Sequence, residues 1–267
     1  MLDHLGEPRI NVTDVWNDLK KRKVQYKNKV NDVNLQKIYV GYEKKYEKFY
    51  KNKISVKKDK EFEIDVYNIE RKYLIKNLTE EDHESLICPI CGHFLYSHNI
   101  ECDHILDKKD YSGLSFIPFN IAVVCHSCNH AKGAKNGSGI FNPYIDDIGN
   151  KKYNIHFNFD FNNKESICIK VELPDDLKDI FKVYGLQEKV IIDAKNRLNE
   201  ITHMITSSIK IKEIKAHKAD IKESLIGMKY SNPLLEKYRV EYFKGNFIDD
   251  LMANFDSYID YIITEYR

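Results

Sequence analysis

The chain has 267 residues and a formal net charge of +1, with 31% charged and 42% hydrophobic residues. This composition is typical of a globular protein and excludes a disordered chain; no apolar run reaches the roughly 18 residues that would predict a transmembrane helix. The first residues, MLDHLGEPRINVTDVW, lack the basic and apolar segments of a signal peptide, so we expect a cytoplasmic, reducing location with no membrane partner.

The charge is unevenly distributed along the chain. Residues 20–60 contain 15 Lys or Arg residues against 4 Asp or Glu residues. Such a basic segment can neutralise the phosphates of a nucleic acid and steer its association. A solvated face of lysine-rich helices would have the same composition, so both interpretations stay open.

The first predicted element is a helical region over residues 13–52, which Thr13 and Asp14 are expected to cap. An apolar and aromatic stripe at helical spacing runs through this region, formed by Leu35, Tyr39, Tyr42, Tyr46 and Phe49. Packing in the core is the favoured use of the stripe, and base stacking is the alternative.

Residues 54–78 are ambiguous. The alternation in EFEIDVY predicts a short strand, and NIERKYLIKNL after it predicts a helix. Residues 79–82 (TEED) resemble the capped start of a further short helix that leads into Cys88.

The second half of the chain begins with a predicted β-hairpin, KYNIHFNFDF and SICIKVEL, around a turn at 162–165. A helix from Pro174 to Gly185 follows, then a long helical run over 187–225 and two helices in LLEKYRVEYF and FIDDLMANFDSYIDYIITEY. We therefore expect an α+β fold in which helical flanks surround a small central module. The expected regions are a mainly helical one (1–84), the central module (85–150), and a hairpin followed by helices (151–267).

The central module contains two Cys-x-x-Cys pairs. The four cysteines are Cys88, Cys91, Cys125 and Cys128. Two such pairs are the ligand pattern of a four-thiolate structural Zn²⁺ site, since each pair turns two sulfurs toward one tetrahedral ion. Cys102 is expected to be buried in a strand, and His93 or His126 could replace one of the cysteines.

Between and after the pairs, the sequence places side chains that suit a second metal. NIECDHIL alternates as a strand does, so Asp103 and His104 would point to opposite sides unless the strand bends. Asn120 precedes the second pair, and Asn129 follows Cys128 at the start of a predicted short helix, NHAKG. A carboxylate, an imidazole and two carboxamides are thus expected around one zinc-fixed scaffold.

These motifs together resemble the HNH, or ββα-metal, endonucleases, and most closely the four-cysteine subgroup typified by phage endonuclease VII. The resemblance covers about 50 residues and implies a ββα-metal core in which His104 is the general base. It further implies that Asp103 and Asn129 bind a catalytic Mg²⁺ or Mn²⁺, and that Asn120 orients the loop and the base. Family members often have Pro or Gly-Gly shortly after the first His, whereas this chain has ILDKKDYSGLSF with Gly113 alone.

The resemblance also implies substrate contacts. Lys132 stands at the lysine of the CNxxK pattern of the family, and with His130 it is a candidate for phosphate contact; an exposed helix residue is the alternative reading of His130. The implied activity is hydrolysis of DNA phosphodiester bonds, with RNA as an alternative substrate. Because ββα-metal cores commonly nick one strand at each site, double-strand cutting would require a homodimer or two events.

Two biological settings fit a nuclease, and a non-catalytic module is a further alternative. IFNPYIDDIGNKKYNIHFNF resembles the segment after the HNH core in some bacterial antiphage nucleases, including those of Septu-type systems, which work beside an ATPase partner. A self-contained type II restriction endonuclease is the first alternative. The second is a non-catalytic zinc knuckle that only binds nucleic acid or protein, which would need none of Asp103, His104 and Asn129.

Overall fold

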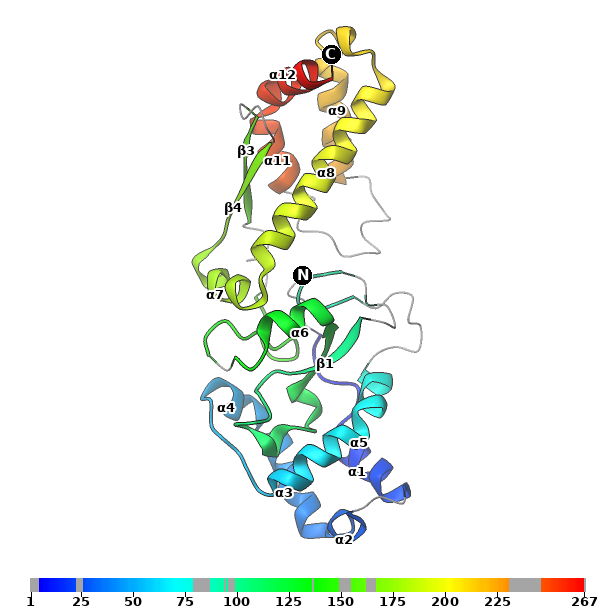
Figure 1. Cartoon of the computed structure of the whole chain (residues 1–267), viewed down its shortest axis with the longest axis vertical. Helices are drawn as coiled ribbons and strands as arrows, with labels where there is room; N and C mark the ends of the chain where they lie inside the picture. Colours follow the sequence, from blue (N-terminus) through cyan, green and yellow to red (C-terminus); the bar gives the residue numbers. More distant parts are fainter. Residues whose placement is uncertain are drawn as a thin grey trace. The chain divides into compact units, whose positions relative to one another are not determined.

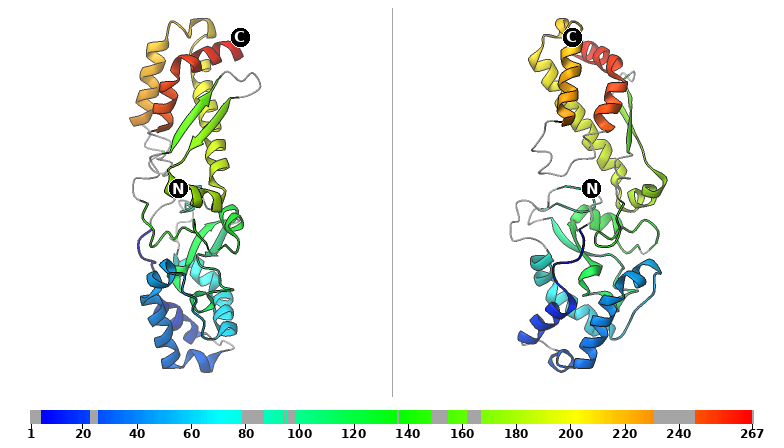
Figure 2. Two further views of the ribbon diagram at one scale, coloured as in Figure 1. Left: turned by 90° about the vertical axis from the view of Figure 1, so that its left-hand side faces the viewer. Right: turned by 180° about the vertical axis from the view of Figure 1, so that it is seen from behind.

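The chain folds as a mostly helical protein with two small antiparallel sheets (Figures 1 and 2). The computed structural model describes residues 5–22, 26–78, 87–93, 95, 99–135, 137–148, 155–161, 167–230 and 246–266. Two compact units divide the chain, Leu2–Asp147 and Ile148–Arg267. The mixed α and β composition agrees with the predicted class, and the first unit contains both the predicted N-terminal region and most of the predicted central module.

The first helix, α1 (Val12–Lys21), starts one residue earlier than expected. Its cap is Asn11 and not Thr13: the Asn11 side chain accepts a hydrogen bond from the backbone of Asp14, whose carboxylate accepts one from the Asn11 backbone. This reciprocal capping box satisfies two backbone donors of the first turn, which a cap at Thr13 would leave without an intrahelical partner.

The single helical region predicted over 13–52 is a series of shorter helices. After α1 come α2 (Lys27–Val30), α3 (Val33–Lys44) and α4 (Tyr46–Lys51). Asp32 restarts the helix before α3 because its carboxylate accepts hydrogen bonds from the next backbone amides. Tyr39 and Tyr46 are buried, so packing in the core is confirmed for these two members of the aromatic stripe.

Residues 60–78 form one helix, α5 (Lys60–Leu78), and the strand expected in EFEIDVY is wrong. The carboxylate of Asp59 accepts a hydrogen bond from the backbone of Phe62 and so stabilises the first turn. The buried positions recur every three or four residues: Phe62, Glu63, Val66, Tyr67, Glu70 and Leu74. The alternation that suggested a strand occupies only the first two turns of this longer pattern, and the longer pattern decides the structure.

An aromatic cluster joins these helices to the loop that carries the candidate site. The ring of Phe116, between the two strands of the central module, lies 4.7 Å from Tyr39 and 6.4 Å from Trp16 and Phe62, measured between ring centroids. Trp16 is fully buried, and its indole donates a hydrogen bond to the carbonyl of Val30 at 2.7 Å. Helices α1, α3 and α5 therefore share one core with the central module.

The central module is a two-stranded antiparallel sheet followed by a short helix. Strand β1 (Ile100–His104) pairs with β2 (Ile121–Cys125), and α6 (His126–Lys132) continues directly from β2. Two short 3₁₀ helices, η2 (Ser112–Leu114) and η3 (Pro118–Asn120), lie in the connection between the strands. The predicted strand at 99–106 and the predicted helix at 129–133 are thus confirmed in position to within a few residues.

The second unit begins with the predicted hairpin, β3 (His156–Asp160) and β4 (Cys168–Glu172). Phe157 and Phe159 point inward and pack edge-on against Phe247. The predicted turn at 162–165 lies outside the described residues. Cys168, the first residue of β4, is half-buried.

Helix α7 (Asp175–Tyr184) ends at Gly185 as predicted, because Gly185 adopts a left-handed conformation with φ of 60°. The long run over 187–225 is two helices, α8 (Leu186–Ser208) and α9 (Lys218–Tyr230), separated by the 3₁₀ helix η5 (Ile211–Glu213). Ile214, which follows η5 directly, is fully buried in the core.

The last predicted helix is also two, α11 (Asn246–Ala253) and α12 (Phe255–Glu265), with Asn254 at the junction. The helix expected in LLEKYRVEYF lies outside the described residues.

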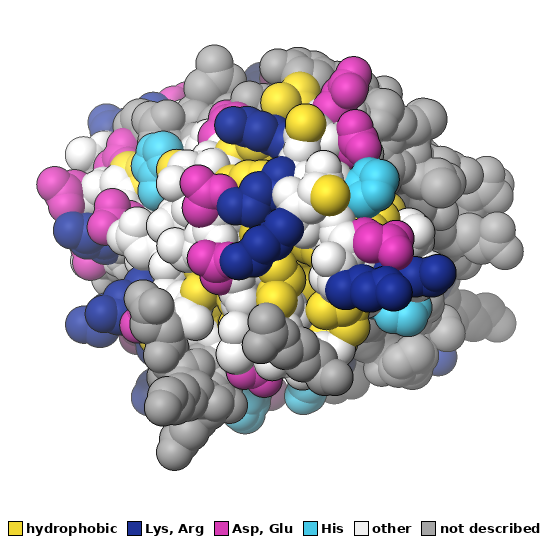
Figure 3. Space-filling view, turned by 90° about the horizontal axis from the view of Figure 1, so that it is seen from above, with side chains coloured by type: hydrophobic (Ala, Val, Ile, Leu, Met, Phe, Trp, Pro, Cys, Tyr) yellow, Lys and Arg dark blue, Asp and Glu magenta, His cyan; other side chains and the backbone are white. Residues whose placement is uncertain are grey.

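Viewed from the end where the C-terminus lies in Figure 1, lysine and arginine side chains gather near the centre of the face with acidic side chains beside them (Figure 3). None of the described helices has both the length and the apolar character needed to cross a membrane.

Gly113 offers a direct test of how tightly the site loop packs on the helical core. A Cβ atom at this position would lie 2.8 Å from the backbone oxygen of Val56, to which the Gly113 amide donates a hydrogen bond. Gly113→Ala should lower the free energy of unfolding by about 1–3 kcal/mol through overpacking. Urea unfolding followed by the fluorescence of Trp16, the single tryptophan, measures the change.

The matched control is Gly41→Ala inside α3, where an added Cβ would meet no atom within 4 Å. This variant should be neutral or more stable by up to about 1 kcal/mol, since alanine favours the helix. Equal stability of the two variants would contradict the packing described for Gly113.

Candidate functional site

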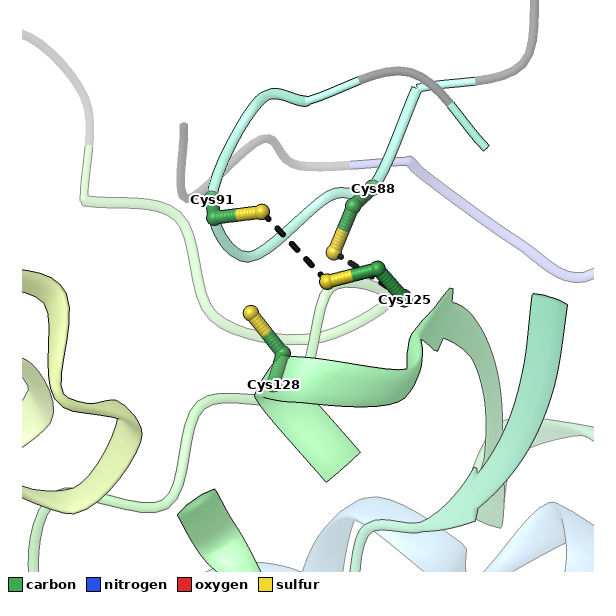
Figure 4. A group of neighbouring side chains, drawn as sticks. All are labelled: Cys88, Cys91, Cys125 and Cys128. Atoms are coloured by element: carbon green, nitrogen blue, oxygen red, sulfur yellow. Dashed lines mark hydrogen bonds between the residues drawn. The ribbon is translucent and has the colours of Figure 1, made fainter. Parts of the chain in front are cut away.

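The four paired cysteines come together in one cluster (Figure 4). All four are buried, and their sulfur atoms lie within 4.8 Å of one another; the sulfurs of Cys91 and Cys125 are 3.6 Å apart. Thiolates bound to a tetrahedral zinc ion at about 2.3 Å lie about 3.8 Å from one another. The cluster therefore has the donor type and the spacing to hold a structural metal ion such as zinc.

A tight turn, the end of β2 and the first turn of α6 bring these four sulfurs together. Cys88 and Cys91 lie on a turn in which the Gly92 amide donates to the Cys88 carbonyl at 2.8 Å, and Gly92 has φ of 76°, a conformation that glycine adopts without strain. Cys125 ends β2 and Cys128 lies in α6. Burial raises the pKa of Cys88 well above its usual value, so its thiolate needs a cation for stability.

Cys102 and His126 do not belong to the cluster. Cys102 is buried in β1, as predicted, and burial raises the pKa of its thiol to about 12. Nδ1 of His126 hydrogen-bonds to the carboxylate of Glu101 at 2.7 Å instead of joining the sulfur cluster. Within the described part of the chain, the four cysteines are the one group of three or more His, Cys, Asp or Glu side chains whose ligand atoms are this close.

Asp103 is buried next to Lys132. The ammonium of Lys132, which is 1% exposed, donates to Oδ1 of Asp103 at 2.9 Å and to the backbone oxygen of His104 at 2.6 Å. Burial raises the pKa of Asp103 to about 6, although the positive charge of Lys132 acts in the opposite direction. This buried ion pair ties α6 to the end of β1, and the predicted contact of Lys132 with phosphate stays a prediction.

His104 lies among residues of α5 and the loop after β1. Its Nε2 is 2.8 Å from the carbonyl oxygen of Ser115, and its ring centroid is 4.2 Å from that of Tyr67. Because a carbonyl can only accept, Nε2 carries the proton and Nδ1 keeps its lone pair. Burial lowers the pKa of His104 to about 3, so the imidazole is neutral at pH 7.

Asn120, the last residue before β2, stabilises the loop between the two strands through its side-chain hydrogen bonds. Its Oδ1 accepts hydrogen bonds from the Tyr46 hydroxyl at 2.8 Å and the Leu106 amide at 2.9 Å. Its Nδ2 donates to the carbonyls of Leu106 and Leu114, both at 3.1 Å. With all of these groups satisfied in a fully buried position, Asn120 fixes the path of the loop and joins it to α4.

Asn129 lies on α6 opposite the start of β1. Its Nδ2 donates to Oε2 of Glu101, and the other carboxylate oxygen of Glu101 binds His126. The exposed His130 lies one turn beyond His126, and the two imidazoles stack with centroids 5.9 Å apart. No contact described for His130 decides between the predicted phosphate contact and an exposed helix residue.

The contacts along β1 follow the predicted alternation. Glu101 and Asp103 contact side chains of α6, whereas His104 contacts Tyr67 of α5. Among the described residues, no hydrogen bond or ion pair joins the imidazole of His104 to Asp103 or Asn129. The structure therefore places Asp103 and Asn129 on the α6 side of the strand and His104 on the α5 side, with Asp103 and His104 both at its end.

Several residues at the site were not predicted from the sequence. They are Tyr46, Tyr67, Glu101 and Ser115. Glu101 had a usable signal, because it precedes Asp103 by two residues and so lies on the same face of the strand. Tyr67 was missed because its segment was read as a strand, and the Ser115 carbonyl carries no signal in the sequence.

Comparisons with known protein families, with curated proteins and with solved structures found no match. The similarity to ββα-metal endonucleases thus stays a prediction, and a functional assignment depends on the residues of the site itself.

The cysteine cluster makes a prediction that can be tested by metal analysis. Cys88→Ser should abolish retention of zinc, of which the wild type should hold about one per chain, and should unfold the Trp16-containing unit, because metal binding at such a site supplies folding free energy. Elemental analysis and Trp16 fluorescence measure the two effects.

Cys168→Ser is the control, since Cys168 lies in the other unit on β4 and outside the cluster. This variant should keep both zinc and the folded state. A folded Cys88→Ser protein with the zinc content of the wild type would contradict the structural role of the cluster.

Proposed function

We propose that the chain is a metal-dependent endonuclease that hydrolyses phosphodiester bonds of DNA. The observation that carries the proposal is the order strand, loop, strand and helix, in which β1 supplies Asp103 and His104 and α6 supplies Asn129. Four clustered cysteines beside the junction of β2 and α6 support the same conclusion, because the resemblance to ββα-metal endonucleases implies this arrangement.

The proposed role of zinc is structural. Four cysteines complete a tetrahedral coordination shell and leave no open position for substrate or water. The ion would fix the Cys88 turn to the end of β2 and the first turn of α6. Its binding would thereby set the position of Asn129, which directly follows Cys128.

The oxygen donors that remain fit a hard metal such as Mg²⁺ or Mn²⁺. Lys132 hydrogen-bonds to Oδ1 of Asp103, and no described residue hydrogen-bonds to Oδ2. Nδ2 of Asn129 is bound to Glu101, and no described residue donates to its Oδ1. One carboxylate oxygen and one amide oxygen suit Mg²⁺, which keeps several waters and binds through few protein ligands.

When bound, such a metal ion supplies Lewis-acid stabilisation of the phosphate and of the leaving oxygen. The protein supplies the base. Nδ1 of His104 can accept the proton of the attacking water while Ser115 holds the Nε2 proton in place. The pKa of about 3 is that of the buried imidazole alone, and an anionic phosphate bound beside the ring would raise it by Coulomb attraction.

The proposal includes DNA as the substrate and an ATPase partner in antiphage defence, and double-strand cutting would require a homodimer or two events. The basic segment at 20–60 supports a nucleic-acid substrate through its excess of positive charge.

The proposed activity can be measured with plasmid, linear duplex, single-stranded DNA and RNA side by side. Purified protein should cleave DNA in the presence of Mg²⁺ or Mn²⁺, and cleavage should stop when EDTA is added. His104→Ala should reduce the cleavage rate by at least about 100-fold, because loss of a general base has an effect of this size.

His203→Ala is the matched control, since His203 is exposed on α8 in the other unit. It should cleave at the rate of the wild type. Full activity of a folded His104→Ala protein would contradict the assignment of His104 as the base. If the wild type binds DNA but shows no metal-dependent cleavage, a non-catalytic zinc module is favoured instead.

A further inference from the structure

We infer that Glu101 is a positioning residue that orients the amide of Asn129, so that Oδ1 of Asn129 is presented to the hard metal ion. The inference rests on the proposed nuclease function and assigns a role to a residue that the motif does not contain. It follows from the hydrogen bonds that join β1 to the first turns of α6.

The first step concerns the chemistry of the pair. An ionised carboxylate can only accept hydrogen bonds, whereas the two ends of an asparagine amide differ: Nδ2 donates and Oδ1 accepts. The contact between Asn129 and Oε2 of Glu101 therefore requires that Nδ2 faces the carboxylate. The amide oxygen then faces away from Glu101 and accepts from no described residue, so it is the end of the side chain that can serve as a metal ligand.

The second step concerns what holds Glu101. Its Oε1 is bound to Nδ1 of His126 at 2.7 Å, so each carboxylate oxygen contacts a different residue of α6. With both oxygens hydrogen-bonded to side chains of α6, the Glu101 carboxylate is held in one position and accepts the hydrogen bond from Asn129.

The third step concerns position along the strand. Glu101 and Asp103 lie two residues apart on β1 and both contact α6. The Glu101–Asn129 contact and the Asp103–Lys132 contact therefore join the same strand face to the same helix. Outer-sphere partners that orient a ligand in this way typically contribute 10–100-fold to metal affinity or activity.

The experiment measures metal binding without turnover. Full-length protein carrying His104→Ala serves as the parent, and Mn²⁺ binding is followed by isothermal titration calorimetry and by the loss of the free-ion EPR signal. Adding Glu101→Gln should weaken Mn²⁺ binding by about 10–100-fold. Zinc content and Trp16 fluorescence should stay at the values of the parent, which separates loss of orientation from loss of fold.

A double-mutant cycle separates orientation from the other effects of the Glu101 charge. Asn129→Asp replaces the amide by a carboxylate, whose two oxygens are equivalent and need no orientation. In this background Glu101→Gln should change Mn²⁺ affinity by no more than about threefold, well below the 10–100-fold loss expected with asparagine. An equal loss in both backgrounds would mean that Glu101 acts as a direct ligand or as a distant charge, and would overturn the inference.

Glu172→Gln is the matched control, because Glu172 on β4 accepts a hydrogen bond from Nδ2 of Asn158 at 2.6 Å in the other unit. It should leave Mn²⁺ affinity unchanged. If Glu101→Gln binds Mn²⁺ as the parent does, the role of Glu101 is overturned while the nuclease proposal stands. If the parent itself binds no Mn²⁺, the hard-metal site and this inference are both overturned.

Discussion

The central module depends on the convergence of four buried thiols at the point where β2 meets α6. A two-stranded sheet and a helix of two turns bury too little apolar surface to be stable alone. Four sulfurs at this spacing are unfavourable as free thiolates and favourable around a divalent metal ion, so a bound ion would stabilise the cluster. It would also fix Cys128, and with it the next residue, Asn129, relative to the strands.

The second support of the site comes from helices that precede it in the chain. Tyr46 of α4 binds Asn120 inside the loop, and the ring of Tyr67 on α5 packs on the imidazole of His104. Phe116 of the same loop joins the aromatic cluster around Trp16. These contacts lie within the unit Leu2–Asp147, and they restrict His104 to one orientation in which the Ser115 carbonyl selects its tautomer.

The features that could be predicted are those that depend on local spacing. Three local patterns specify their structure within a few residues of sequence: the paired cysteines, the alternation in the segments on either side of residues 162–165, and Gly185 after an amphipathic run. The wrong strand prediction and the contacts that were not predicted both have tertiary causes. Residues 61–67 alternate like a strand, but burial of Phe62 and Val66 against other helices favours the longer helical pattern. The contacts of His104 with Tyr67 and Ser115 join positions distant in sequence, and no local pattern reports them.

The central claim is that one metal holds the site while a second one acts in it. It is tested most directly by measuring zinc content and plasmid cleavage on one sample, after brief EDTA treatment and desalting. The account predicts that about one zinc ion per chain is retained, that cleavage is absent, and that added Mg²⁺ restores cleavage without a change in zinc. Full cleavage by the treated protein without added metal, or recovery with Zn²⁺ alone, would contradict it.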